Sequence, residues 1–348
     1  MMWPMTVAVP RALLSSARDG VSGADEEDLS LAGEDHAFGL RRQVQRLVAL
    51  DVRFGGDHTS TIALRTLAAV RRELRRRGVR PRARREVQAA VAELAEVTGW
   101  LLCDADRHAL SIRVNRWALD LARRAGDRSM ELFVVHNLSL QATYLRHPER
   151  SLALVRPVLD RGGLTPRLTA MFTLRIARAY AQMGLRTEAV RALDTTRGRL
   201  SEGVGVRDPH WAWWVSERGL AHATGAMLGG LGEWGSAIDP IQRALEAAPE
   251  SAYRDRFLYL CVLMHAYVEA GARHDAERVA DDLLPLLGTV GSSRPLARLR
   301  ETLDRFSRDH GQPRGVRDTV GEIRQAVNSA RRSVIEPATR KPPGAGPW

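Results

Sequence analysis

The chain has 348 residues, 44% of them hydrophobic, and a formal net charge of +11. This length provides for a large buried core and fits either two domains or one elongated array of repeats. No stretch has the roughly 18 consecutive apolar residues of a membrane span, and the N-terminus lacks the pattern of a secretory leader. We therefore expect a protein without a membrane partner that works in the cytoplasm.

The positive charge comes from arginine, because Lys341 is the only lysine. A basic balance of this size is typical of proteins with acidic partners such as nucleic acid. A second explanation is codon bias, since a GC-rich genome favours arginine and alanine over lysine. Charge alone therefore leaves both explanations open.

The two ends of the chain have the composition of tails. Residues 1–36 hold seven acidic residues against two arginines, with few large apolar side chains. Residues 332–348 hold four prolines. Such segments bury too little apolar surface to fold alone, so we predict two disordered tails around one helical domain at residues 37–331.

Between these tails the hydrophobic spacing is helical. Leu40, Val44 and Leu47 follow the period of one helix face, and no segment alternates as a strand does. Short breaks separate the helices, which makes sequential helices antiparallel neighbours. The breaks lie at Gly78, Gly126, Gly162 and Gly163, Gly184, Gly232 and Gly271. The sequence predicts an all-α fold.

Three of these hairpins share one spacing. A large residue late in the first helix is followed after four residues by glycine, and after five more by alanine. The sets are Tyr180, Gly184 and Ala189; Leu228, Gly232 and Ala237; Tyr267, Gly271 and Ala276. Trp100 and Ala109 have the same total spacing with Asp104 at the expected turn.

This spacing is typical of tetratricopeptide (TPR) hairpins, in which a large residue packs on a small one across the turn. The three alanines lie 48 and 39 residues apart, against a TPR period of about 34. We therefore expect degenerate TPR-like hairpins, with HEAT-type geometry as the alternative. Stacked hairpins would form an α-solenoid, a right-handed superhelix with a concave binding surface.

Four segments resemble segments of a large group of actinobacterial regulators. They are RRQVQRLVALDVRFGG at 41–56, GWLLCDADR at 99–107, DRSMELFVV at 127–135 and DPHWAWW at 208–214. In that group an Xre-type helix-turn-helix domain precedes a TPR-like region. The resemblance covers residues 38–310. Residues 1–37 are too short and too acidic for a helix-turn-helix domain. The resemblance thus implies the interaction half of a regulator of transcription, development or secondary metabolism, without its DNA reader.

The TPR register predicts which side chains line the concave face. Amide and arginine side chains there would hold the backbone and carboxylate of a partner protein or short peptide. The alternative is hydrogen bonding between repeats. The expected residues are Asn137, Gln141, Arg178, Gln182, His222, His265 and Glu269.

The densest aromatic cluster is Trp211, Trp213 and Trp214. Trp211 and Trp214 are three residues apart and share one helix face, so they are candidates for an aromatic wall of the binding site. The alternative is packing between adjacent hairpins.

Nine arginines lie between residues 71 and 85. They would suit sequence-independent contact with nucleic-acid phosphates, or else form a solvated face at a helix C-terminus. The candidates for nucleic-acid contact are Arg71, Arg72, Arg75, Arg76 and Arg77. No aromatic residue interleaves them, so stacking on unpaired bases is not indicated.

Signatures of catalysis are missing from the sequence. It has no Walker A motif and no dinucleotide-binding glycine motif. Cys103 and Cys261 are far apart, and no pair of histidines or cysteines has metal-ligand spacing. We predict a non-enzymatic binding protein that needs no cofactor or metal, with a homodimer as an open alternative.

Overall fold

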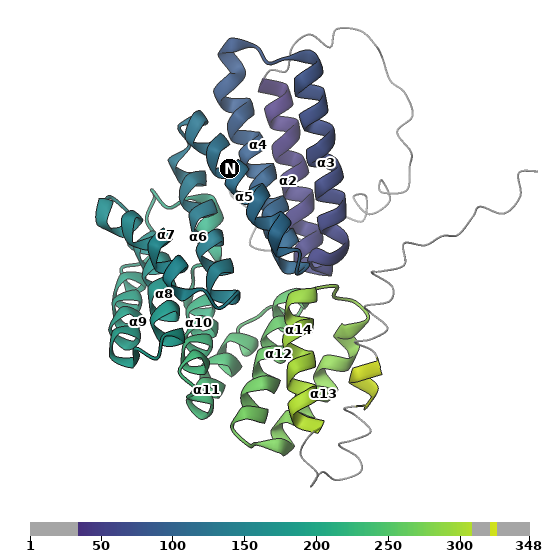
Figure 1. The fold of residues 1–348 in the computed structure, drawn as a ribbon, viewed down its shortest axis with the longest axis vertical. Coiled ribbons are helices and arrows are strands. Elements are labelled where there is room, and N and C mark those ends of the chain that lie inside the picture. Colours follow the sequence, from purple (N-terminus) through teal and green to yellow (C-terminus); the bar gives the residue numbers. More distant parts are fainter. Residues whose placement is uncertain (1–33, 308–320, 326–348) are drawn as a thin grey trace, which may run out of the picture.

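The computed structural model describes residues 34–307 and 321–325, which form helices joined by short connections with no β-strand among them (Figure 1). The all-α prediction is confirmed for this part of the chain. The predictions for residues 1–33 and 332–348 lie outside the described residues. Helix α2 begins at Glu34, inside the stretch expected to be a tail.

The helices follow one another in a regular order. The N-terminal elements are α2 (Glu34–Phe54), α3 (Gly56–Arg77), the 3-10 helix η1 (Pro81–Ala83), α4 (Arg84–Asp104) and α5 (His108–Ala125). The middle holds α6 (Arg128–Tyr144), α7 (Pro148–Arg161), α8 (Pro166–Gln182), α9 (Arg186–Ser201) and the 3-10 helix η2 (His210–Trp214). The last are α10 (Glu217–Gly230), α11 (Trp234–Glu246), α12 (Tyr253–Glu269), α13 (Arg273–Leu287) and α14 (Ser293–Ser307).

Five neighbouring pairs make up most of the fold: α4 with α5, α6 with α7, α8 with α9, α10 with α11, and α12 with α13. The first helix of each pair contacts the first helix of the next, and α12 contacts α14 in the same way. Helix α14 in turn contacts α4, so these six helices form a closed cycle of contacts. We call these six helices the inner layer.

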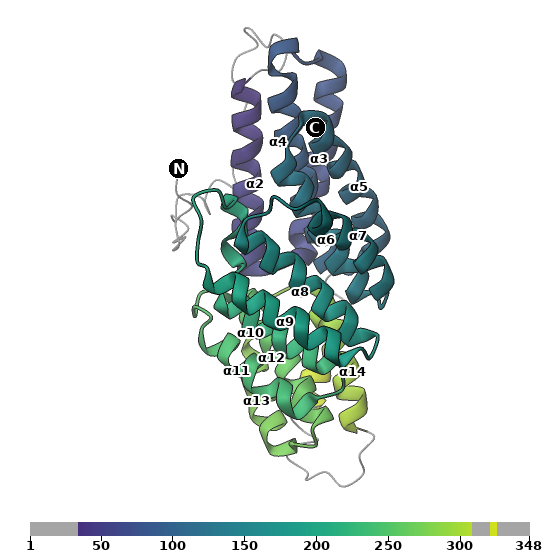
Figure 2. The same cartoon turned by 90° about the vertical axis from the view of Figure 1, so that its left-hand side faces the viewer.

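The inner layer closes because N-terminal and C-terminal helices of the described chain meet. Helix α12 also packs on α2, although the two are separated by most of the sequence. Figures 1 and 2 show the long helices α2–α5 extending away from the shorter C-terminal helices, with the contact at the near ends. The inner layer therefore contains helices from both halves of the chain.

The turn within each pair is the same in all five. One residue has a left-handed backbone, and the next N–H donates to the carbonyl five residues earlier. This is the hydrogen bond that commonly ends a helix at a left-handed residue. The left-handed residues are Asp106, Arg146, Gly184, Gly232 and Gly271. The three glycine turns expected from the sequence are confirmed.

A small residue lies five positions after each left-handed residue, and its side chain is fully buried. The five are Ser111, Ser151, Ala189, Ala237 and Ala276. The expected pairing of Trp100 with Ala109 across Asp104 was wrong, because the turn is at Asp106 and Ala109 is exposed. Ser111 fills the place instead, and its hydroxyl donates to the Gly99 carbonyl at 2.7 Å.

Candidate ligand-binding site

The inner layer is closed by a buried carboxylate at the end of α4. Asp104 is fully buried and accepts hydrogen bonds from Gly56 N (3.1 Å), Ser292 Oγ (2.5 Å), Arg254 Nη2 (2.8 Å) and Arg294 Nη2 (3.1 Å). Both guanidinium groups also lie over the ring of Trp100, at 5.0 and 5.6 Å from its centroid. Asp104 therefore joins α4 to α3, α12 and α14.

The ionisation of Asp104 follows from this geometry. Burial opposes the charged form, but Arg254 and Arg294 together hold the pKa of Asp104 well below its usual value. The Asp104 carboxylate is thus negatively charged at neutral pH. We call Asp104, Arg254, Arg294 and Trp100 the closure cluster.

Two expected binding residues on α6 connect neighbouring pairs. Asn137 Nδ2 donates to Glu96 Oε1 at 2.5 Å, and Gln141 Nε2 lies 3.0 Å from His108 Nδ1. Both amides are buried. Burial, together with the nearby charge of Glu93, raises the pKa of Glu96 to about 8, so this carboxyl is largely neutral at pH 7. These contacts match the alternative of hydrogen bonding between repeats.

Two expected residues on α12 contact α14. His265 is buried, and its Nδ1 lies 2.8 Å from Thr302 Oγ1. Glu269 pairs with Arg305. A pocket of about 440 Å³ opens beside this pair and is lined by Val268, Glu269, Gly271, Arg273, Arg305 and Phe306. The structure therefore places Glu269 at a pocket and His265 within the packed helices.

The tryptophans pack against α6. Trp211 is buried, stacks on Phe133 with ring centroids 4.4 Å apart, and donates from Nε1 to Ser129 Oγ at 2.9 Å. Trp214 is half-buried, with its ring centroid 4.9 Å from that of His136. The two side chains share one hydrophobic cluster, which matches the packing alternative.

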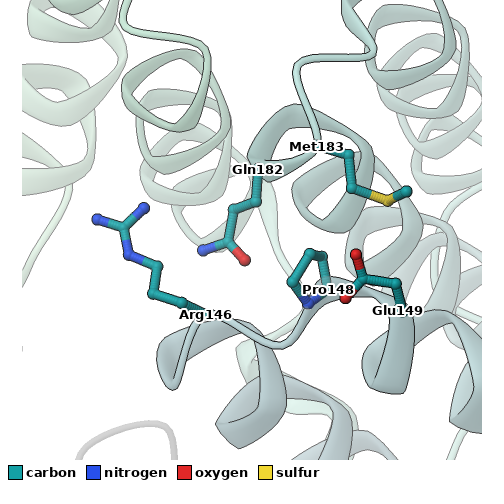
Figure 3. Close-up of a pocket in the computed structure, with 5 residues that line it drawn as sticks. All are labelled: Arg146, Pro148, Glu149, Gln182 and Met183. Atoms are coloured by element: carbon teal, nitrogen blue, oxygen red, sulfur yellow. The ribbon is translucent and has the colours of Figure 1, made fainter.

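Arg178 and Gln182 lie one turn apart on α8, and Gln182 lines a pocket. The pocket has a volume of about 390 Å³ and is lined by Arg146, Pro148, Glu149, Gln182 and Met183. Gln182 donates to the Thr143 carbonyl at 2.8 Å, while its buried Oε1 has no partner. In Figure 3 the Gln182 amide points toward the side of the pocket on which Arg146 lies.

Arg175, one turn before Arg178, was not among the expected site residues. Its side chain is only 3% exposed, yet its Nε and Nη1 make no hydrogen bond. The neighbouring Leu174 lies in the core. The available signal was an arginine inside the apolar run AMFTLRIARAYA.

His222 on α10 belongs to the same region of the inner layer. It is half-buried, with its ring centroid 4.9 Å from that of Tyr259 on α12. Burial, together with the charges of Arg178, Arg294, Arg175 and Arg218, lowers the pKa of His222 to about 3. His222 is therefore neutral at pH 7 and surrounded by positive charge.

The residues expected to contact nucleic acid lie at the end of the long helices that points away from α12–α14. Arg71, Arg72, Arg75 and Arg76 are exposed near the end of α3. Arg77 is partly buried and lies 3.7 Å from Glu73. The end of α3 and the start of α4 lie far from α12–α14 in Figure 1. This surface is thus distant from the C-terminal helices of the inner layer.

No protein-family model matches the chain, and no curated protein matches it. Within residues 34–307 and 321–325, no helix is long and apolar enough to cross a membrane. The same residues contain no cluster of three or more His, Cys, Asp or Glu side chains that could hold a metal.

Proposed function

We propose that this protein is a TPR-like regulator that binds a partner protein or short peptide through its inner layer. In this proposal the paired helices form an α-solenoid with a right-handed superhelical path. The repeated turns and buried small residues support the TPR-like class. Binding would influence transcription, development or secondary metabolism through the partner, in line with the regulators that the sequence resembles.

The observation that carries the proposal is the pocket at Arg146 and Gln182. Gln182 Oε1 is a buried acceptor without a donor, which a peptide N–H would satisfy. Arg146 is exposed at the pocket and forms no ion pair among the described residues. Its guanidinium would take a peptide carbonyl or carboxylate, while Pro148 and Met183 supply apolar surface.

The first prediction tests this pocket with peptides. We expect a random peptide library selected on the wild-type protein to yield peptides whose affinity falls at least about tenfold in Arg146→Glu/Gln182→Ala, since each lost charge-assisted bond costs about 1.5 to 3 kcal/mol. Isothermal titration with the selected peptides measures the change. The melting temperature should stay close to that of the wild type.

The control for this experiment is Arg150→Glu, which reverses an exposed arginine two residues beyond Pro148. Peptide affinity should be unchanged in this variant. Equal binding to the double variant and the wild type would show that the selected peptides bind elsewhere, and would refute the proposal for this pocket.

A second candidate function is direct DNA binding by the arginines of α3. The observation that favours it is the exposure of Arg71, Arg72, Arg75 and Arg76 on one helix end. Arginine side chains in such a row neutralise phosphates and release counterions, which makes binding depend steeply on salt. The slope of the logarithm of the affinity against the logarithm of the salt concentration would then report the number of phosphate contacts.

The second prediction concerns this surface. If it binds DNA, Arg72→Glu/Arg75→Glu/Arg76→Glu should abolish the retardation of DNA fragments in a salt-titrated gel shift, and single Arg→Gln changes should each lower the salt slope by about 1. The control reverses three exposed arginines of α9, namely Arg191, Arg197 and Arg199. Retardation that persists in the α3 variant would reject DNA binding by this surface.

A further inference from the structure

Arg175 is a buried cation without an anion. Its side chain lies in the middle of α8, and no carboxylate in the described part of the chain pairs with it. A buried charge without a partner costs several kcal/mol, because nothing replaces its lost hydration. Burial, together with the charge of Arg178, lowers the pKa of Arg175 well below its usual value. A bound anion would offset this free-energy cost.

Arg178 extends this feature toward solvent. It lies three residues after Arg175, on the same side of α8, and is half-buried. It too forms no ion pair among the described residues. Burial, together with the charges of Arg294, Arg298 and Arg146, lowers the pKa of Arg178 to about 10. Two adjacent guanidinium groups are thus left uncompensated.

The elements that face these two arginines add positive charge or neutral imidazole. Helix α14 contributes Arg294, which pairs with Asp104, and Arg298, which lies 3.9 Å from Glu301. The turn after α6 contributes Arg146. Helix α10 contributes His222, which is neutral at pH 7. Asp104 and Glu301 are thus engaged by other arginines, and no carboxylate among the described residues forms an ion pair with Arg175 or Arg178.

His136 on α6 supplies a second buried group without a partner. Its Nδ1 lies 3.1 Å from Asn137 Oδ1, an acceptor, so Nδ1 carries the proton. Its Nε2 is then an acceptor, and it is buried without a hydrogen bond. Burial, together with Arg175, lowers the pKa of His136 well below its usual value, so the ring is neutral. Donors on α8 and an acceptor on α6 are thus both unoccupied.

We propose that Arg175 and Arg178 form a binding site for the phosphoryl group of a small molecule on the inner layer. Two uncompensated guanidinium groups are balanced by two negative charges, which a phosphate monoester supplies and a single carboxylate does not. Its oxygens can accept from both forks at once. This site is one turn from the peptide pocket but does not depend on the proposed peptide function.

The third prediction uses inorganic phosphate as the probe. Wild-type protein should bind phosphate in isothermal titration at constant ionic strength, and Arg175→Gln should weaken binding at least about tenfold. Arg175→Lys should keep weaker binding, because it keeps the charge but loses the fork. Arg191→Gln, on the exposed face of α9, should bind as the wild type does.

The stability of the free protein distinguishes a ligand site from a structural arginine. Because Arg175 is unpaired, Arg175→Gln should leave the melting temperature without phosphate unchanged or raise it. A clear fall would mark Arg175 as structural and overturn the proposal. Phosphate binding that survives Arg175→Gln, the absence of phosphate binding to the wild type, or tighter binding of acetate than of phosphate would also overturn it.

Discussion

Asp104→Asn should destabilise the protein by about 3 to 5 kcal/mol, the usual loss when one partner of a buried ion pair is removed. The carboxylate is fully buried and compensates both Arg254 and Arg294. Asparagine has nearly the same shape, but it removes the carboxylate that pairs with Arg294. It also takes from Arg254 its shortest ion pair and leaves that guanidinium with Asp51 and Asp255, each at 3.4 Å. Its amide nitrogen would also face donors in place of one acceptor oxygen. Urea unfolding at pH 7, followed by circular dichroism, measures the loss.

The matched control for this experiment is Asp239→Asn. Asp239 pairs with Arg243 at 3.1 Å on α11, but both side chains are more than half exposed. Exposed ion pairs contribute little, so this variant should unfold nearly as the wild type does. A loss below about 1 kcal/mol for Asp104→Asn would contradict the role of Asp104 in closing the inner layer.

Hydrogen exchange gives an independent view of the same variant. The closure cluster is formed by residues 150 and 190 positions apart in the chain. If Asp104 holds these segments together, Asp104→Asn should raise amide exchange in α14 and at the start of α12 before it affects α8. A uniform rise throughout the described helices would indicate general loosening, and not opening at the closure.

Local patterns in the sequence determine what could be predicted of the fold. The helices and three of the turns could be recognised because the spacing of apolar residues and the glycine at a left-handed turn are both visible within a few consecutive residues. The first two turns were missed because Asp106 and Arg146 take the left-handed place, and Ser111 and Ser151 replace alanine. Both serine hydroxyls form hydrogen bonds within the core, so serine can occupy the place of the small alanine. A search for alanine at this position does not detect it.

The site was less predictable than the fold, because it depends on contacts between distant segments. The repeat register selected Gln182, which lines a pocket, but it also selected Asn137 and Gln141, which bind neighbouring helices. The lack of a partner for Arg175 is a property of the assembled structure. No spacing in one sequence shows whether a carboxylate from another helix will reach an arginine.

His265 gives the second large effect, through pH. Its Nδ1 donates to Thr302 Oγ1, because that hydroxyl uses its own proton for the Arg298 carbonyl. Burial, together with the charges of Arg298, Arg305 and Arg146, lowers the pKa of His265 to about 3. The unfolded chain takes up a proton near pH 6.5, whereas the folded protein does not, so stability falls as the pH decreases from 6.5 toward 3.

At pH 5 this one histidine should cost about 2 kcal/mol relative to pH 7, from 1.4 kcal/mol for each pH unit below 6.5. His265→Gln keeps a donor for Thr302 but does not titrate, so the variant should lose about 2 kcal/mol less than the wild type between these pH values. Glu96, whose pKa is raised to about 8, acts in the opposite direction and cancels because both proteins contain it. Urea unfolding at pH 7 and pH 5 measures the difference.

The same experiment decides between two roles for His265. A histidine locked between α12 and α14 must produce this loss, because its proton would have to enter a packed and positively charged site. A histidine that faces solvent to contact a partner would take up its proton with little loss of stability. His274→Gln, which changes a histidine with an 86% exposed side chain, should follow the wild type at both pH values. If His265→Gln also follows the wild type, His265 is accessible on the inner layer and returns to the set of partner-binding candidates.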